Sequence, residues 1–188
     1  AWLYANLIQR YGGVPIIKDV YGLGDEYNAT RATFDECVDF ILADLKLAKE
    51  LLPEYDKAVL GRANKDIAMA VEARLTLIAA SAWFNDESDP TPSNPLTKGA
   101  YSKTKWDRAL KANKAFLDQC GPHYSLPAKY SDFWTNPGSS EIIWAKYFNN
   151  TSGDLAGRTA KAQYYYGPAS LGGWRGCAPT EALIIDYE

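Results

Sequence analysis

The sequence predicts a mainly α-helical protein, made of tetratricopeptide-like antiparallel helix pairs with long irregular loops. Three stretches, at about 33–52, 65–84 and 105–119, carry apolar residues at helical spacing. The loops between them differ in length, so the helix pairs do not form a regular array. Hydrophobic residues make up 47% of the 188 residues and charged residues 23%, which fits a globular domain and excludes general disorder.

Residues 1–10 are predicted to form the end of a helix, because their apolar side chains gather near one face. Gly12 and Gly13 then end this helix, and Pro15 prevents its immediate continuation. Residues 12–32 are rich in Gly and Asp. We expect them to form an irregular connection.

A second helix is expected to begin at Thr33, which forms a capping box with Glu36. Apolar and small residues then follow at helical spacing, while charged residues mostly occupy the other side: Phe34, Val38, Ile41, Leu45, Ala48 and Leu52. Pro53 ends the helix. The charged side is interpreted as a solvated face.

The helix at about 65–84 has Asn64 as its candidate N-cap. It is rich in alanine, so a neighbouring helix can approach closely. With the preceding helix it would form an αα-hairpin. The next helix, at about 105–119, carries Trp106 three residues before Ala109, a combination typical of tetratricopeptide helices.

Two segments are predicted to be irregular. Residues 85–104 contain three prolines and several Ser and Thr, so we expect a loop. Residues 121–188 are interrupted by Gly, Pro and Asn, and their apolar run Glu141–Phe148 fits a short strand or a buried turn. We favour the strand. The whole is expected to be one domain over 1–188, with a helical scaffold at 1–120 and a loop-rich aromatic region after it.

Charge and hydropathy exclude two classes of partner. The net charge is −3 and the pI about 5.3, and no block of Lys and Arg supplies the basic face that nucleic acid requires. No apolar run approaches the roughly 18 residues of a membrane span. The chain has no signal peptide, begins inside a helical pattern and stops without a cap. It is therefore expected to be the central piece of a longer protein.

No arrangement of residues predicts catalysis, a metal or a cofactor. Glycoside hydrolysis needs two facing carboxylates, and no spacing couples Asp132, Glu141 or Asp154 in the aromatic region. His123 is the sole histidine, and neither a nucleophile relay nor a phosphate-binding loop accompanies it. We interpret it as a turn residue. We expect no catalytic residue, no metal site and no cofactor.

Three cysteines make an odd set without metal-ligand spacing. Cys37 lies on the apolar face of its predicted helix, so a buried free thiol is expected. The state of Cys120 and Cys177 stays open between a bridge and free thiols. The cysteines therefore do not decide the redox compartment.

Several short phrases follow one another along the chain in a characteristic order: Arg10–Pro15, Arg31 with Thr33, Asp44-Leu45 with Leu52-Pro53, Gly61–Ala63 with Ala73-Arg74, Trp106–Ala109, Tyr124–Leu126, Glu141–Trp144 and Pro179–Glu181. Each phrase alone is weakly specific. Together they span nearly the whole chain. Their order and spacing resemble the SusD/RagB family, the glycan-capturing outer-membrane lipoproteins of Bacteroidetes-type bacteria.

The resemblance implies a function and a location. It implies a tetratricopeptide-like scaffold that binds starch or other glycans without catalysis during nutrient uptake. It also implies docking on a SusC-like, TonB-dependent transporter at the cell surface of the outer membrane. Membrane association would come only through a lipid anchor that lies outside this chain. Glycan-contacting residues vary within the family, so the resemblance assigns none of them here.

The binding residues are instead predicted from chemistry. Sugars bind flat aromatic rings edged by amide or guanidinium groups. Residues 123–178 hold 11 of the 25 aromatic residues, in the region where regular structure fades and recognition loops are expected. The predicted glycan-binding residues are Trp174, Arg175, Tyr164, Tyr165, Tyr166, Asn149 and Asn150.

Each of these residues also has a structural interpretation. Trp174 lies in a glycine-rich segment and either faces a ligand or folds back over the core. The tyrosine triplet could serve packing alone, and the two asparagines could be ordinary turn residues. Three further tryptophans, Trp106, Trp134 and Trp144, are expected in the core.

Two other functions remain open at this point. Helix pairs of this kind also serve as protein-interaction scaffolds, and such a role is compatible with glycan capture. The family also includes members that capture peptides or other nutrients, so the ligand class is open. Accessible Trp and Tyr rings in the aromatic region would favour a ligand-binding protein over a pure scaffold.

Overall fold

The computed structural model describes residues 1–26, 28–129, 136, 138–147, 169–172, 174 and 176. These residues contain helices and no strand, which confirms the predicted helical fold class. The α-helices are α1 (Trp2–Tyr11), α2 (Phe34–Leu51), α3 (Lys65–Ala80) and α4 (Thr104–Cys120), and the 3-10 turns are η1 (Tyr55–Lys57), η2 (Gly121–His123) and η3 (Ala169–Leu171). None of the helices in these ranges is both long and apolar enough to cross a membrane.

The chain divides into two compact units, Ala1–Ala145 and Lys146–Glu188. The four α-helices all belong to the first unit, together with η1 and η2. The second unit contains η3 and Trp174 among its described residues. The expectation of one domain over 1–188 stays a prediction.

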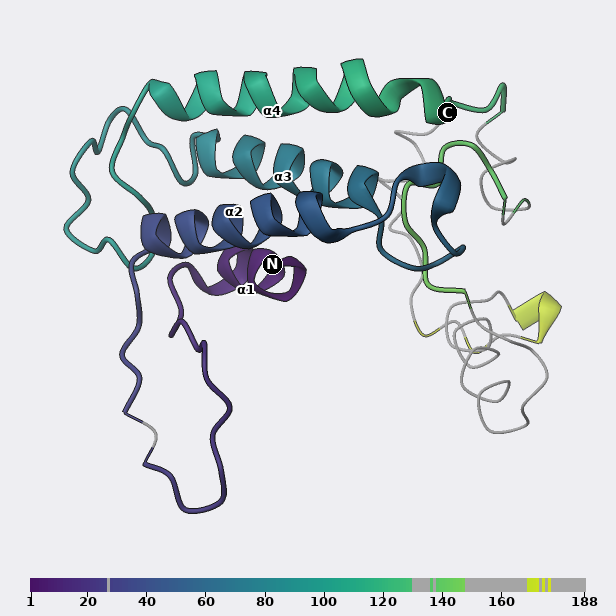
Figure 1. The fold of residues 1–188 in the computed structure, drawn as a ribbon. Helices are drawn as coiled ribbons and strands as arrows, with labels where there is room; N and C mark the ends of the chain where they lie inside the picture. The colour runs from purple at the N-terminus through teal and green to yellow at the C-terminus, as the bar shows by residue number, and fades with distance from the viewer. Residues whose placement is uncertain are drawn as a thin grey trace. The chain divides into compact units, whose positions relative to one another are not determined.

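Three helices of the first unit form an antiparallel layer (Figure 1). α3 lies between α2 and α4 and packs against both of them. α1 crosses beneath this layer, where it contacts α2 and α3. This arrangement packs α3 against three helices, which explains why Leu75, Thr76, Ala79 and Ala80 are all buried in it.

The core lies where α1 and α2 meet α3. Ile8, Phe34, Ile41 and Leu75 are fully buried there. The ring of Phe34 stacks on that of Phe84, with centroids 4.4 Å apart. Burial of each such side chain contributes about 1.5–3 kcal/mol to folding, so this cluster supplies much of the stability that holds α1 in place.

Local capping determines where α2 and α3 begin. Thr33 Oγ1 accepts a hydrogen bond from the Glu36 backbone N–H at 3.2 Å, and the Glu36 carboxylate accepts from the Thr33 N–H at 2.8 Å. Asn64 Oδ1 accepts from the Ile67 N–H at 3.0 Å. Both predicted N-caps are therefore confirmed, because each satisfies amides that have no partner within the helix.

α3 ends at Ala80, before the expected position near residue 84. Ser81 adopts an extended backbone, with φ −62° and ψ 154°, and its hydroxyl donates to the Ile78 carbonyl at 2.6 Å. Serine side chains compete in this way with the helical hydrogen-bond ladder. Phe84 is thus free to turn inward and stack on Phe34.

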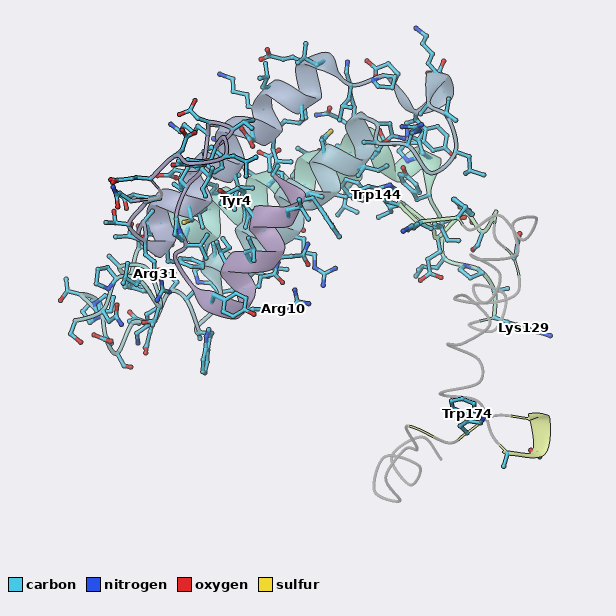
Figure 2. The ribbon with its side chains drawn as sticks, turned by 90° about the horizontal axis from the view of Figure 1, so that it is seen from below. Tyr4, Arg10, Arg31, Lys129, Trp144 and Trp174 are labelled. Carbon is cyan, nitrogen blue, oxygen red and sulfur yellow. The ribbon has the colours of Figure 1, made fainter. Side chains whose placement is uncertain are left out.

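The two ends of the connection between α1 and α2 lie directly against each other. Gly12 ends α1 with φ 70°, a conformation that favours glycine. A Cβ at Gly13 would lie 2.0 Å from the Ala32 carbonyl oxygen, so the two chain segments approach too closely for any side chain. Arg31 ties the same region together by donating to the carbonyls of Tyr11 and Gly13 at 2.7 and 2.8 Å (Figure 2).

The strand expected over Glu141–Phe148 is absent from its described part, residues 141–147. The Ile142 N–H instead donates to the Ser139 carbonyl at 3.0 Å and forms a turn. Apolar, β-branched residues favour a strand only where another extended segment pairs with them, and this segment has no ladder of such bonds to a neighbour among the described residues. Of the alternative interpretation, a buried turn, the turn is correct, but the segment is only partly buried, with Trp144 and Tyr147 exposed.

Two tryptophans expected in the core are partly exposed. Trp106 on α4 is 47% exposed and Trp144 is 42% exposed. Trp134 lies outside the described residues. A large ring often lies half-buried with its polar atom bonded, and Trp144 does so, because its Nε1–H donates to the Gly61 carbonyl at 3.2 Å.

Candidate functional site

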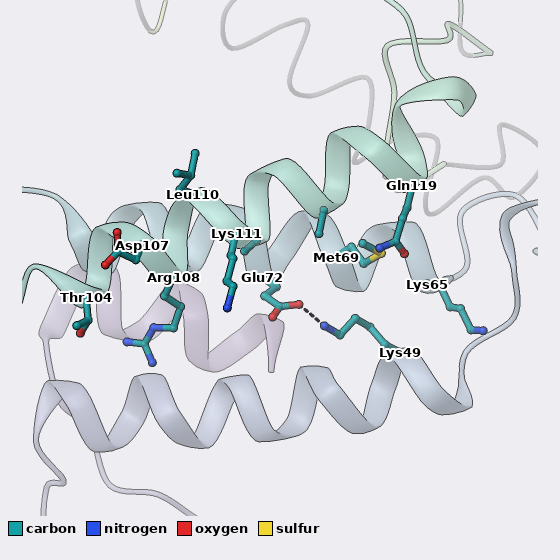
Figure 3. A pocket seen from close by; sticks show the side chains of 12 residues that line it. Lys49, Lys65, Met69, Glu72, Thr104, Asp107, Arg108, Leu110, Lys111 and Gln119 are labelled. Atoms are coloured by element: carbon teal, nitrogen blue, oxygen red, sulfur yellow. Dashed lines mark hydrogen bonds and ion pairs between the residues drawn. The ribbon is translucent and has the colours of Figure 1, made fainter.

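Two grooves flank α3 in the first unit. The larger has a cavity volume of about 1060 Å³ and lies between α2 and α4, with α3 as its floor (Figure 3). We call it the charged groove, because six ionic side chains line it: Lys49, Lys65, Glu72, Asp107, Arg108 and Lys111. No aromatic residue is among its lining residues.

Most of the cations in the charged groove are paired. Lys49 forms an ion pair with Glu72 across the groove (Figure 3). Arg108 forms an ion pair with Asp39 on α2, with 3.3 Å between Nη1 and Oδ1, and Lys65 forms one with Glu54. Pairs at a partly exposed surface contribute little to stability, about 0–1 kcal/mol. They do bridge α2 to its neighbours, so this groove is explained by helix packing.

The second groove has a cavity volume of about 540 Å³ and is formed by α1, α3, α4 and the turn around residue 143. We call it the tryptophan groove. The rings of Trp2 and Trp144 meet edge to face in it, with centroids 5.5 Å apart and planes at 76°. Trp144 thereby lies beside the N-terminal end of α1 (Figure 2). Phe116 of α4 adds a third aromatic ring to the lining.

Polar groups surround these rings. Asn6 and Gln9 on α1, Arg74 on α3 and Asn113 on α4 all line the tryptophan groove. Asn6 donates to the Trp2 carbonyl at 2.9 Å, and Asn113 donates to the carbonyls of Ala73 and Ala109 at 3.1 and 2.9 Å. In both amides the NH₂ group is engaged, which orients the side chain and leaves the oxygen as an acceptor.

A polar cluster joins the ends of α3 and α4. Asp66 is buried, and its carboxylate lies 2.6 Å from Nδ1 of His123. The imidazole stacks on the Tyr55 ring, with centroids 4.4 Å apart. His123 lies in η2, so it is a turn residue as expected, and it also packs the chain against α3.

The acidity of this cluster does not favour nucleophilic chemistry. Burial, and after it the Asp66 carboxylate, raises the pKa of Cys120 to about 12. Burial also raises the pKa of Tyr124. A thiol is reactive only as the thiolate, and a raised pKa makes that form scarce at neutral pH. In the described part of the chain, no three His, Cys, Asp or Glu side chains are grouped so that they could hold a metal ion.

Known proteins that match this chain are SusD-like. The model of a SusD-like family, described as starch-binding and associating with the outer membrane, matches residues 1–77. A SusD-like protein from Bacteroides fragilis NCTC 9343, BF3747, has a solved structure that is 27% identical over 97% of this chain, with a TM-score of 0.63. These matches support the resemblance to the SusD/RagB family that was drawn from the sequence.

A second solved structure is also similar. The protein BT4246 is 26% identical over 92% of this chain, with a TM-score of 0.52. This SusD-like chain spans about a third of each of the two structures, since the matches cover 32% of both. No curated protein matches the chain.

Only one predicted glycan-binding residue of this SusD-like chain can be placed. Trp174 lies in the second unit, and its side chain is 69% exposed. The other six predicted residues lie outside the described residues: Arg175, Tyr164, Tyr165, Tyr166, Asn149 and Asn150. The predicted binding role of all seven stays a prediction. Cys177 also lies outside the described residues, whereas Cys37 and Cys120 are free and buried.

The tryptophan groove was not among the sites predicted from the sequence. A pattern that indicates it was nevertheless present, because Trp2, Asn6 and Gln9 are spaced by four and three residues and so share one face of a helix. Trp144 carries no comparable pattern, since it comes from a turn far along the chain. Its position beside Trp2 follows from the packing of the helices.

Proposed function

We propose that this protein binds polysaccharide or oligosaccharide at the cell surface, without catalysis, as part of a nutrient-uptake system. It would pass the glycan to a SusC-like, TonB-dependent transporter in the outer membrane, and a lipid anchor would hold it there. The observation that carries this proposal is the match of residues 1–77 to a family described as starch-binding and associating with the outer membrane.

The physical support comes from the helical frame and from exposed aromatic rings. Paired helices hold the first unit together through a fully buried core. Trp174, exposed at 69%, has the ring area that stacking on a sugar requires. Arg175, the tyrosines at 164–166 and the asparagines at 149–150 would supply further rings and hydrogen bonds.

The expected affinity is weak for a single site. A well-placed aromatic pair adds roughly 0.5–1.5 kcal/mol beyond the burial of its area, and a millimolar Kd corresponds to about −4 kcal/mol. Two or three rings with a few hydrogen bonds reach that range. A polysaccharide offers repeating ligands, so multivalent binding raises the apparent affinity on a cell surface.

Calorimetric titration of the full-length protein against polysaccharides, oligosaccharides and peptides tests the proposal. We expect at least one glycan to bind, and Trp174→Ala to weaken that binding by about fivefold. Trp83→Ala is the matched control, because Trp83 is 78% exposed and belongs to the first unit. We expect it to leave the affinity unchanged.

Three results would contradict the proposal or part of it. Binding of peptides alone would show that the ligand class is wrong. Equal affinities for the Trp174→Ala and unsubstituted proteins would remove Trp174 from the site. Reducing ends released from a bound glycan by rigorously purified protein would show that the protein is an enzyme.

A further inference from the structure

We propose that the tryptophan groove is a subsite for a short oligosaccharide, built entirely from the first unit, with Trp2 and Trp144 as its stacking rings. The inference rests on the proposed function and adds a location to it. Neither the predicted residues around Trp174 nor the matched family description places a ligand in this groove.

The two rings are both accessible and fixed. Trp2 is 49% exposed and Trp144 is 42% exposed, so each keeps about half of its surface open. The Trp144 indole is held by its hydrogen bond to the Gly61 carbonyl at 3.2 Å, and the edge-to-face contact at 5.5 Å holds Trp2 against it. Rings that are already ordered lose little entropy when a ligand binds.

The polar groups in the groove match the hydroxyls of a sugar. Asn6, Gln9 and Asn113 bring neutral amides, whose oxygens can accept hydrogen bonds from sugar hydroxyls. The acceptor oxygens of Asn6 and Asn113 are oriented by the bonds that their NH₂ groups make to backbone carbonyls. Oriented amides beside apolar rings are suited to a ligand that has both C–H faces and hydroxyl edges.

Arg74 defines the charge of the ligand. Its side chain is exposed and forms no ion pair among the described residues, and no Asp or Glu lines the groove. The groove therefore carries one uncompensated positive charge. It accepts neutral or carboxylate-bearing sugars and disfavours cationic peptides.

The size and lining of the groove favour an oligosaccharide over a cationic peptide. Its volume of about 540 Å³ lies within the roughly 300–1,000 Å³ of small-molecule sites. The charged groove on the other side of α3 is larger but offers no ring for stacking. Among the described residues of the first unit, the tryptophan groove thus brings rings and amides to the same cavity.

The test uses the full-length protein titrated with maltoheptaose, xylohexaose and an oligogalacturonate. For the oligosaccharide that binds, we expect Trp2→Ala to raise the Kd about tenfold, which corresponds to the upper range for one aromatic contact. Arg74→Ala should raise the Kd about threefold. Trp106→Ala is the matched control, since Trp106 is 47% exposed and does not line the groove. It should leave the Kd within twofold.

The outcomes separate the inference from the proposed function. If a glycan binds and both Trp2→Ala and Arg74→Ala leave its Kd unchanged, the inference is wrong while the proposed function stands. If no glycan binds, both are wrong. A peptide that binds in place of any oligosaccharide and depends on Trp2 would also overturn the inference. Should Trp2→Ala fail to fold, Trp2→Leu and Arg74→Ala give the decision, because Arg74 forms no side-chain hydrogen bond or ion pair with any residue that the structure describes.

Discussion

The guanidinium of Arg31 donates a hydrogen bond to the carbonyl of Tyr11, 2.7 Å away and 20 residues earlier in the chain. A second bond from the same side chain reaches the Gly13 carbonyl at 2.8 Å. The end of α1 leaves carbonyls without helical partners, and Arg31 satisfies them from the far side of the 12–32 connection. Both carbonyls belong to the phrase Arg10–Pro15, so this phrase has a structural role in the fold.

Replacement of Arg31 should loosen this closure. We expect Arg31→Ala to lower the free energy of unfolding by about 1–2 kcal/mol, because two charge-assisted hydrogen bonds are lost at an exposed site. Arg31→Lys should recover at most half, since an ammonium group does not reproduce the planar fork of a guanidinium. Urea denaturation measures both. Arg10→Ala, at an exposed neighbour, should change stability by less than about 0.5 kcal/mol, and an equal effect at both positions would contradict the assigned role.

A side chain at Gly13 should be poorly tolerated. The Cβ of alanine there would lie 2.0 Å from the Ala32 carbonyl oxygen, and the backbone would have to shift. We expect Gly13→Ala to destabilise the protein by about 3 kcal/mol, as overpacking does, with thermal unfolding as the measurement.

Gly121 provides the opposite case. A Cβ at this position meets nothing within 4 Å, and its backbone is right-handed helical, with φ −49°. Gly121→Ala should therefore raise stability by about 0.4–1 kcal/mol through the unfolded chain. If both glycine variants had the same effect, the close approach of the backbone at Gly13 would not be the cause.

The N-cap of α2 should contribute measurably to stability. Thr33→Ala removes the side-chain oxygen that accepts from the Glu36 N–H, and we expect a loss of about 1 kcal/mol. Thr33→Ser keeps that oxygen and is the matched control. Chemical denaturation of the two variants should differ by most of this amount, and two indistinguishable curves would argue against the capping box.

Alkaline pH should weaken the fold through Cys120. Burial and the Asp66 carboxylate raise the pKa of its thiol from 9.0 to about 12, so the folded state keeps a proton that the unfolded state releases first. The contribution of this thiol to the free energy of unfolding is complete below about pH 9 and is lost as the pH rises toward 12. The urea midpoint should fall across this window.

The Cys120→Ala variant identifies the group responsible. Its midpoint should fall less steeply with pH than that of the unsubstituted protein, because the titrating thiol is gone. Cys37→Ala is a useful comparison, since burial also raises the pKa of Cys37. If neither variant changed the slope, the partly buried Tyr124 would be the group that titrates.

The family resemblance and the main helices could be predicted because they depend on short stretches of sequence. Thr33 and Glu36 are three residues apart, as are Asn64 and Ile67, so both N-caps were visible in the chain. Prediction was less exact where the local structure depended on a neighbouring segment or on a competing side-chain hydrogen bond. The apolar run after Glu141 lacked a neighbouring strand and formed a turn, and α3 ended early at Ser81, where a side-chain bond replaced the helical one.

The sequence by itself determined the helical class and the helix starts, because capping and 3.6-residue periodicity act between residues close along the chain. Its short phrases also carried the family resemblance. Only the tertiary structure decided that Trp144 meets Trp2 and donates to Gly61, from 142 and 83 residues away. Contacts over such distances depend on how the helices pack around α3. The local spacing of Trp2, Asn6 and Gln9 indicates only one wall of the groove that these helices create.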